Sequence, residues 1–139
     1  NKEKAGVRHY KKGDYRKAYE KLRFPAETGL KEAQYYIGFM YLKGQHVKQS
    51  LGTGMAWLGT ACESEIPEWQ ATFDQIYRAL SPEHQNSIDR NVSLYIEKYG
   101  LETQEMDCTS ASNVGSRKAT VNCRKTPTAK MQIEDTKQF

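Results

Sequence analysis

The chain has 139 residues, of which 37% are hydrophobic and 27% are charged. This length fits one small domain, and no apolar run approaches the roughly 18 residues that a membrane-spanning helix needs. The net charge of +4 is too small to indicate nucleic-acid binding by itself.

The charge is unevenly distributed along the chain. Residues 1–50 carry 12 basic and 5 acidic side chains, whereas residues 51–100 carry 3 basic and 7 acidic ones. A charged face that is simply solvated is one explanation, and a basic binding surface is the other.

Comparison of the chain with itself indicates a repeat. Tyr10 and Gly13 correspond to Tyr41 and Gly44, an offset of 31 residues that grows to 36 further along the chain. Repeats of this length are typical of stacked helix pairs. The pattern predicts a helix pair repeated about two and a half times, with a longer turn inside the second copy.

The first predicted pair begins with a helix over 3–12 that ends at Gly13, and Asp14 can cap the next helix. One apolar stripe of that second helix is made by Tyr15, Ala18, Tyr19, Leu22 and Ala26. Pro25 is expected to kink or shorten the helix, because it lacks an N–H and crowds the preceding turn. Gly29 then ends it.

The second pair is predicted from a further apolar stripe and a long turn. The stripe consists of Ala33, Tyr36, Ile37, Met40 and Tyr41. Gly44 closes this helix, the turn spans Gly44–Gly54, and Ser50 is a plausible N-cap. The following helix is expected to pack through Met55, Trp57, Leu58 and Ala61.

Two more helices are predicted before residue 100. Pro67 suits the first turn of a helix that continues through Ile76 and Leu80. Ser81 and the proline after it can start the last helix, which ends at Gly100. We therefore expect an all-α fold, a short α-solenoid of about six helices in antiparallel pairs. Residues 1–100 would form this domain, capped by its last helix, and residues 101–139 a polar appendage.

The run Ala33-Gln34-x-x-Ile37-Gly38-x-Met40-Tyr41-x-x-Gly44-x-x-Val47, followed by Trp57 and Ala61, resembles the Sel1-like repeat, a relative of the tetratricopeptide repeat. The resemblance covers roughly residues 5–80. The stretch before residue 30 is similar to the half-degenerate first repeat of small secreted bacterial members of this family. Gly54 stands where these repeats usually carry Ala, and Glu65 where they usually carry Gly. The resemblance implies a protein-binding adaptor or assembly scaffold, and it implies no catalytic residues.

Stacked helix pairs leave a concave surface made by the first helix of each pair. Five of the nine tyrosines fall on these first helices, namely Tyr10, Tyr35, Tyr36, Tyr41 and Tyr77. With Arg8 and Lys12, they are the candidate partner-binding residues. The alternative is that they are core residues whose hydroxyls reach water.

The three cysteines differ in their surroundings. Cys62 lies on a helix beside alanine and is expected to be a buried packing residue. Cys108 and Cys123 bracket a polar, glycine-centred stretch with too few apolar residues to hold itself. They form either a disulfide, worth on the order of 3 kcal/mol, or two free thiols in a disordered tail.

If the disulfide forms, it indicates an oxidising compartment such as the periplasm, or secretion, with a signal peptide already removed. The bracketed stretch could form a hairpin that turns near Asn113–Gly115, with Val121 on its second strand. Beyond Lys125 the sequence is polar, and we expect it to be disordered or ordered by a partner.

No sequence pattern indicates catalysis. The chain has no phosphate-binding loop, no convincing catalytic triad and no paired-carboxylate motif. The chain contains no Cys-x-x-Cys motif, and His9, His46 and His84 lie far apart in the sequence. The spacing of these residues therefore does not indicate a zinc site. We expect no enzyme activity, cofactor, metal ion or small-molecule substrate.

The leading hypothesis is therefore a helical-repeat adaptor of the bacterial cell envelope that binds another protein. The alternative is a binder of polyanions, meaning nucleic acid (the less favoured partner), anionic lipid or acidic polysaccharide. It rests on nine basic residues, Lys2, Lys4, Arg8, Lys11, Lys12, Arg16, Lys17, Lys21 and Arg23. A weaker third possibility is self-association, in which the acidic middle of one copy meets the basic end of another.

Overall fold

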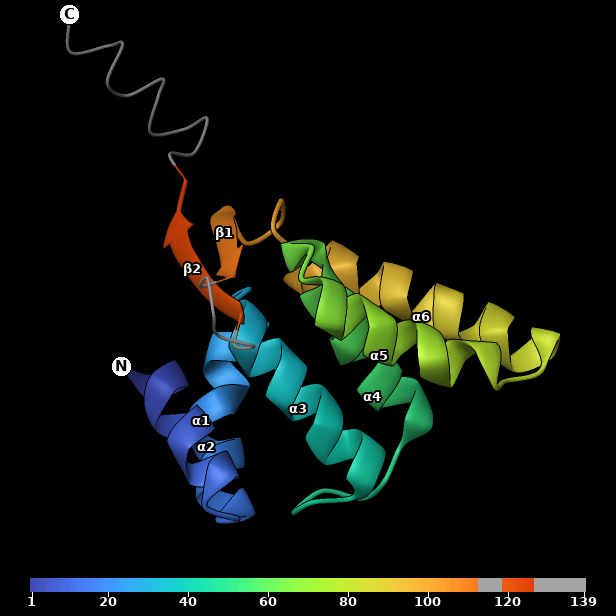
Figure 1. Cartoon of the computed structure of the whole chain (residues 1–139), viewed down its shortest axis with the longest axis horizontal. Coiled ribbons are helices and arrows are strands. Elements are labelled where there is room, and N and C mark those ends of the chain that lie inside the picture. Colours follow the sequence, from blue (N-terminus) through green and yellow to red (C-terminus); the bar gives the residue numbers. More distant parts are fainter. Residues whose placement is uncertain (113–118, 127–139) are drawn as a thin grey trace, which may run out of the picture.

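The computed structural model describes residues 1–112 and 119–126, and these residues form six α-helices followed by a two-stranded hairpin (Figure 1). The helices stack as antiparallel pairs, which confirms the predicted short all-α solenoid. The helices are α1 (Lys2–Lys11), α2 (Tyr15–Glu27), α3 (Lys31–Lys43), α4 (Leu51–Ala61), α5 (Pro67–Arg78) and α6 (Pro82–Tyr99). The short 3-10 helix η1 (Cys62–Ser64) follows α4, and the strands are β1 (Met106–Ser112) and β2 (Ala119–Lys125).

The predicted helix starts are confirmed by their capping hydrogen bonds. The side chains of Asp14, Ser50 and Ser81 each accept a hydrogen bond from the backbone N–H three residues further on, at 3.3, 3.1 and 3.2 Å. Pro67 and Pro82 occupy first-turn positions of α5 and α6, where a missing N–H costs no helical hydrogen bond.

The turns after α1, α2 and α3 each contain a glycine in the left-handed region. The φ angles of Gly13, Gly29 and Gly44 are 81°, 98° and 68°. Side chains with a Cβ rarely adopt these angles, so glycine favours a helix end at each of these turns.

The expectation that Pro25 shortens α2 is wrong. The helix continues through Pro25 to Glu27. Pro25 lies in the last turn, so its missing N–H removes a single hydrogen bond close to the helix end. The Thr28 hydroxyl donates to the Pro25 carbonyl oxygen at 3.0 Å and closes this turn.

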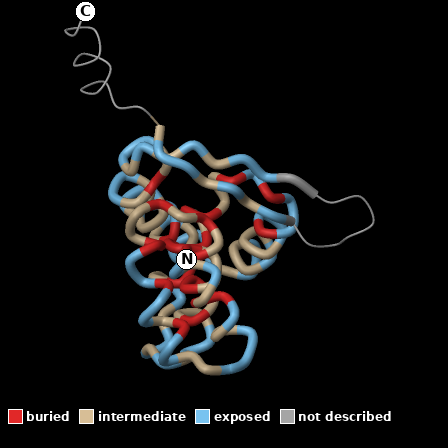
Figure 2. Tube along the Cα trace, turned by 90° about the vertical axis from the view of Figure 1, so that its left-hand side faces the viewer, coloured by how far each residue is buried: buried red, intermediate tan, exposed pale blue. Residues whose placement is uncertain are grey.

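The core follows the predicted apolar stripes. Figure 2 shows the buried segments gathered in the interior of the helix stack. The largest cluster joins α1 to α4 and consists of Val7, Ala18, Leu22, Ala26, Ala33, Ile37, Met40 and Trp57. Two smaller clusters extend it, one with Met55, Leu58 and Ile88, the other with Ala61, Ile66 and Trp69.

Helices α3 and α4 cross at close range. A Cβ on Gly38 would lie 3.1 Å from the Gly54 carbonyl oxygen, and a Cβ on Gly54 would lie 2.7 Å from the Leu42 side chain. Gly54 therefore fits this contact better than the alanine that Sel1-like repeats usually carry.

The C-terminal hairpin is antiparallel, with Cys108 directly opposite Cys123. These two cysteines form the predicted disulfide. Val121 lies on β2 as expected and packs against the cluster around Trp69. The predicted turn near Asn113–Gly115 and the tail from residue 127 lie outside the described residues.

Candidate interaction surface

Six aromatic rings form a continuous row across four helices, α1, α2, α3 and α5, and we call it the aromatic row. It consists of Tyr10, Tyr15, Tyr35, Tyr36, Phe39 and Trp69. Ring centroids lie 5.4 Å apart for Tyr10 and Tyr15, 5.0 Å for Tyr10 and Tyr36, and 5.5 Å for Tyr36 and Tyr35. Tyr35 then contacts Phe39 at 4.8 Å and stacks on Trp69 at 4.3 Å.

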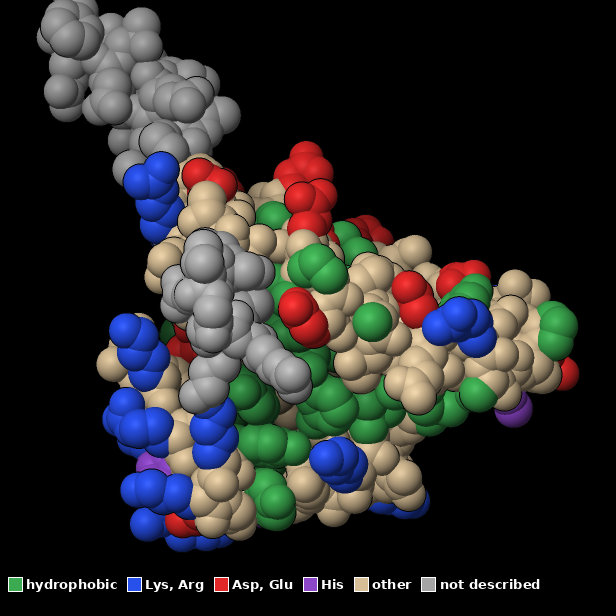
Figure 3. Space-filling model, viewed as in Figure 1, with side chains coloured by type: hydrophobic (Ala, Val, Ile, Leu, Met, Phe, Trp, Pro, Cys, Tyr) green, Lys and Arg blue, Asp and Glu red, His purple; other side chains and the backbone are tan. Residues whose placement is uncertain are grey.

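Five of the six rings lie on the first helix of a pair, and Tyr15, the first residue of α2, is the exception. Helices α1, α3 and α5 lie toward the viewer in Figure 1. Helix α5 packs on α4, and its Trp69 also stacks on Tyr35 of α3. Hydrophobic side chains form a band across this face between α3 and α5 in Figure 3. A continuous apolar band flanked by polar side chains is a typical protein-binding feature.

The tyrosines of the row are both core residues and surface residues. Tyr10 and Tyr36 pack against the largest core cluster, Tyr35 packs against the two smaller ones, and all three remain partly exposed. Burial raises the pKa of each of the three hydroxyls. They therefore stay neutral near pH 7 and can present both an apolar ring and a hydrogen-bonding group.

Tyr41 does not belong to the row. Its hydroxyl lies 3.3 Å from the hydroxyl of Tyr19 on α2, and the Tyr19 ring in turn lies 5.5 Å from His46. Tyr41 is six residues from Tyr35 and five from Tyr36, so the helical turn directs it to another side of α3. The expected grouping of all first-helix tyrosines is incomplete for this reason.

Tyr77 also lies apart from the row. Its hydroxyl donates to Asp89 Oδ2 at 3.1 Å, and its ring stacks on Phe73 with centroids 5.8 Å apart. The hydrogen bond to Asp89 joins the C-terminal end of α5 to α6, whereas the stacking on Phe73 lies within α5, so Tyr77 serves the packing of that pair.

Arg8 on α1 and Lys12, the residue after this helix, are exposed on either side of Tyr10 in the sequence. Within residues 1–112 and 119–126, neither side chain makes a hydrogen bond or ion pair. Their charges are therefore free to meet a partner at the α1 end of the row.

Sequence reasoning assigned Tyr10, Tyr35 and Tyr36 to the site but omitted Tyr15, Phe39 and Trp69. Phe39 carried a usable signal, because it lies four residues after Tyr35 and so shares its side of the helix. The sequence contained no signal for Trp69, because its stacking on Tyr35 joins two helices that are distant in sequence.

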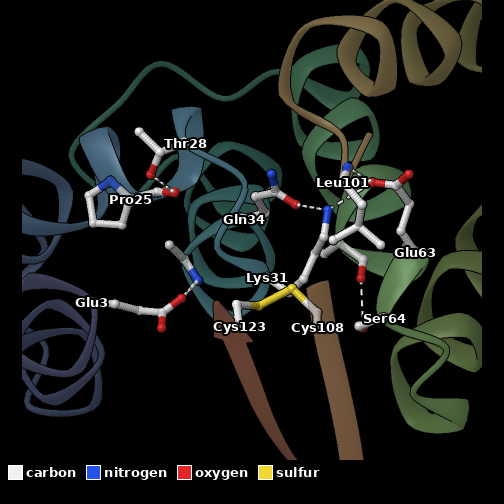
Figure 4. The surroundings of a disulfide bond; sticks show 12 residues. Glu3, Pro25, Thr28, Lys31, Gln34, Glu63, Ser64, Leu101, Cys108 and Cys123 are labelled. Carbon is white, nitrogen blue, oxygen red and sulfur yellow. Dashed lines mark hydrogen bonds and ion pairs between the residues drawn. A yellow bond between two sulfur atoms is a disulfide. The ribbon is translucent and has the colours of Figure 1, made fainter. Parts of the chain in front are cut away.

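A buried polar network centred on Lys31 joins α3 to α4 and η1, beside the hairpin (Figure 4). The Lys31 side chain is fully buried, and its Nζ donates to Gln34 Oε1 at 2.9 Å, to the Thr60 carbonyl at 3.2 Å and to Glu63 Oε1 at 2.8 Å. Burial lowers the pKa of the Lys31 ammonium, while Glu63 opposes that shift. All three donor positions are satisfied, so the network is a structural support.

Cys62 is a free, half-buried thiol, and burial raises its pKa to about 12. Cys62 packs against the cluster around Trp69, as expected, but it is half-buried rather than buried. Its raised pKa is unlike that of a reactive cysteine, which needs a low one. Among the described residues, no group of three or more His, Cys, Asp or Glu side chains could hold a metal ion. Within the same residues, no helix is long and apolar enough to cross a membrane.

In comparisons with known proteins, no family model matches the chain, and no curated protein or solved structure is significantly similar to it.

Proposed function

We propose that the chain is a non-catalytic helical-repeat adaptor that binds another protein through the aromatic row. The observation that carries this proposal is the continuity of six neighbouring rings across α1, the start of α2, α3 and α5. Trp69 is buried, but the other five rings remain partly exposed, so a partner could reach most of the row.

The chemistry of the row suits a protein partner. Tyrosine and tryptophan are enriched at protein interfaces, because their rigid rings bury a large area at a low entropic cost. Tyr35 and Trp69 are stacked in the absence of a partner, which reduces the ordering that binding would otherwise require. We expect Tyr36, between Tyr10 and Tyr35, to be the central contact residue.

The setting we propose is the bacterial cell envelope, as a periplasmic or secreted protein. The Cys108–Cys123 disulfide supports an oxidising compartment, since such bonds are rare where glutathione keeps thiols reduced. Kinship with the Sel1-like repeats is part of the same proposal and rests on the sequence pattern alone.

The proposal is tested by affinity capture from an envelope extract, followed by titration of the captured protein in purified form. The variant is Tyr10→Ala/Tyr36→Ala, and its matched control is Tyr19→Ala/Tyr77→Ala, which removes two half-buried tyrosines outside the row. Both are compared with wild type by thermal unfolding, so that a loss of stability is separated from a loss of contact.

We expect wild type and the control to bind alike and the row variant to bind at least tenfold more weakly, because central aromatic contacts dominate interfaces. Equal binding by the two double variants would refute the assignment of the row. Since the contact is mainly apolar, we also expect the affinity to change little with salt.

A further inference from the structure

The α1–α2 pair carries a second surface, an edge that runs along both helices and has Phe24 at the end opposite Tyr10 and Tyr15. Phe24 on α2 is 63% exposed, and the other large hydrophobic residues exposed in the described part of the chain are Leu94 at 52% and Leu51 at 40%. The Nζ of Lys2 lies 6.0 Å from the centroid of the Phe24 ring. An exposed aromatic ring with a lysine ammonium beside it is not explained by the packing of the helices.

The cations around Phe24 are arranged in stripes. Lys17, Lys21 and Phe24 follow one another at the i, i+4, i+7 spacing of a single helix face, and all three are exposed. Lys4, Arg8 and Lys11 repeat this spacing on α1 and are also exposed. Figure 3 shows Lys and Arg side chains along the edge of the molecule that α1 and α2 form.

The acidic residues of this helix pair are already engaged. The carboxylate of Glu3 turns inward and accepts the Ala33 N–H at 3.1 Å. Glu20 and Glu27 form ion pairs of 3.0 and 3.2 Å with cations on their own helix, and Asp14 lies 3.8 Å from Lys17.

Several cations on the same pair lack such a partner. Within residues 1–112 and 119–126, none of Lys2, Lys4, Arg8, Lys11, Lys12 and Lys21 forms an ion pair. The edge therefore presents uncompensated positive charge beside one apolar anchor.

We infer that this edge, defined by Phe24 and the exposed cations of α1 and α2, docks on the surface of an anionic phospholipid bilayer. Lipid headgroups diffuse within the membrane, so they can meet two separate stripes of cations without any fixed spacing. The Phe24 ring can enter the boundary between headgroups and acyl chains, where burial of an apolar side chain is favourable. The disulfide supports a compartment that is bounded by membranes and poor in nucleic acid.

The test is cosedimentation of the full chain with vesicles of phosphatidylcholine alone and with added phosphatidylglycerol. We expect binding only to the vesicles that contain phosphatidylglycerol. Binding should weaken steeply as ionic strength rises from about 10 mM to about 1 M, over which the screening length falls from about 30 to about 3 Å. Absence of binding to anionic vesicles at low salt would overturn the inference.

Two pairs of variants separate the edge from the overall charge. Lys2→Glu/Lys21→Glu is matched by Lys48→Glu/Lys98→Glu, which changes the net charge equally at exposed sites elsewhere. We expect the first to weaken binding about tenfold or more and the second to have a much smaller effect. Equal loss in both variants would mean that net charge, rather than this edge, attracts the membrane.

Phe24→Ser is compared with Leu94→Ser, since both residues are largely exposed. We expect several-fold weaker vesicle binding for Phe24→Ser alone. Retention on heparin or single-stranded DNA without vesicle binding would assign the edge to a soluble polyanion and overturn the lipid assignment. These variants leave the aromatic row intact, so the outcome is independent of the proposed adaptor function.

Discussion

The ammonium nitrogen of Lys31 lies 2.8 Å from Oε1 of Glu63, and the Lys31 side chain is completely shielded from solvent. The same Glu63 oxygen accepts the Leu101 N–H at 3.1 Å. One carboxylate oxygen thus joins the start of α3 to the segment that leads into the hairpin. The arrangement links the helical repeats to the C-terminal part of the chain.

We therefore expect Glu63→Ala to destabilise the protein by about 3 kcal/mol, because it leaves a buried ammonium without its countercharge. Urea unfolding followed by far-UV circular dichroism measures the loss. The double variant Lys31→Met/Glu63→Ala is the control, and we expect it to be more stable than Glu63→Ala. If the double variant is instead the less stable of the two, the buried charge is not the cause.

The local features of this fold could be predicted from the sequence, because neighbouring residues determine them. Asp14, Ser50 and Ser81 satisfy backbone N–H groups three residues away, so short-range chemistry predicts each cap. The pairing of Cys108 with Cys123 likewise followed from the composition of the stretch between them.

The contacts between distant segments could not be predicted in this way. Lys31 follows a glycine turn and a leucine, a position at which lysine is usually exposed. Its burial depends on Thr60 and Glu63, about thirty residues away. The sequence groups Tyr41 with Tyr36 because both lie on one helix. In the structure Tyr36 contacts Tyr10 whereas Tyr41 contacts Tyr19, so the two side chains belong to different surfaces.

Glu65 has a φ of 60°, a left-handed conformation, at the position where Sel1-like repeats usually carry glycine. A side chain with a Cβ is strained there by about 1 kcal/mol, and Glu65 is exposed. We expect Glu65→Gly to stabilise the protein by up to about 1 kcal/mol, measured as a higher melting temperature. Glu68→Gly, inside the first turn of α5, should instead destabilise it by about 0.5–1 kcal/mol.

Gly6 lies where α1 crosses α2. A Cβ at this position would lie 2.5 Å from Cγ of Leu22, a fully buried side chain. We expect Gly6→Ala to destabilise the protein by about 1–3 kcal/mol, although alanine is the better helix former. Gly52→Ala is the matched control, because its Cβ would meet only the side-chain nitrogen of Asn91, at 3.1 Å. Equal stability of both variants would contradict the close crossing of α1 and α2.

The Cys62 thiol should make stability depend on pH. Burial raises its pKa from 9.0 to about 12, so the folded protein keeps a proton that the unfolded chain loses above pH 9. The stability contributed by the neutral thiol therefore falls as pH rises between 9 and 12, by about 1.4 kcal/mol per pH unit.

Urea unfolding of wild type and Cys62→Ala between pH 8 and pH 10 isolates this effect, because the other titrating groups are common to both proteins. We expect the stability difference between them to stay constant below pH 9 and to shift in favour of the variant above it. A difference that is independent of pH would show that the thiol is not held protonated.

The disulfide should stabilise the hairpin more than the helices. Cys108 and Cys123 are 15 residues apart, and closing a loop of this size contributes about 3 kcal/mol in the chain-entropy model. A two-stranded hairpin is marginal by itself, and this one contacts the helices through Val121 beside Trp69. We therefore expect Cys108→Ser/Cys123→Ser to lose hydrogen-exchange protection over β1 and β2 while α1 to α4 keep theirs.

Two measurements complete this test. Alkylation of the unreduced, unfolded wild type should label one thiol, that of Cys62, because the other two cysteines are bonded. Tryptophan emission of the double variant should shift to longer wavelength as Trp69 gains exposure. If the variant keeps both the emission of wild type and the protection of β1 and β2, packing rather than the disulfide holds the hairpin on the helices.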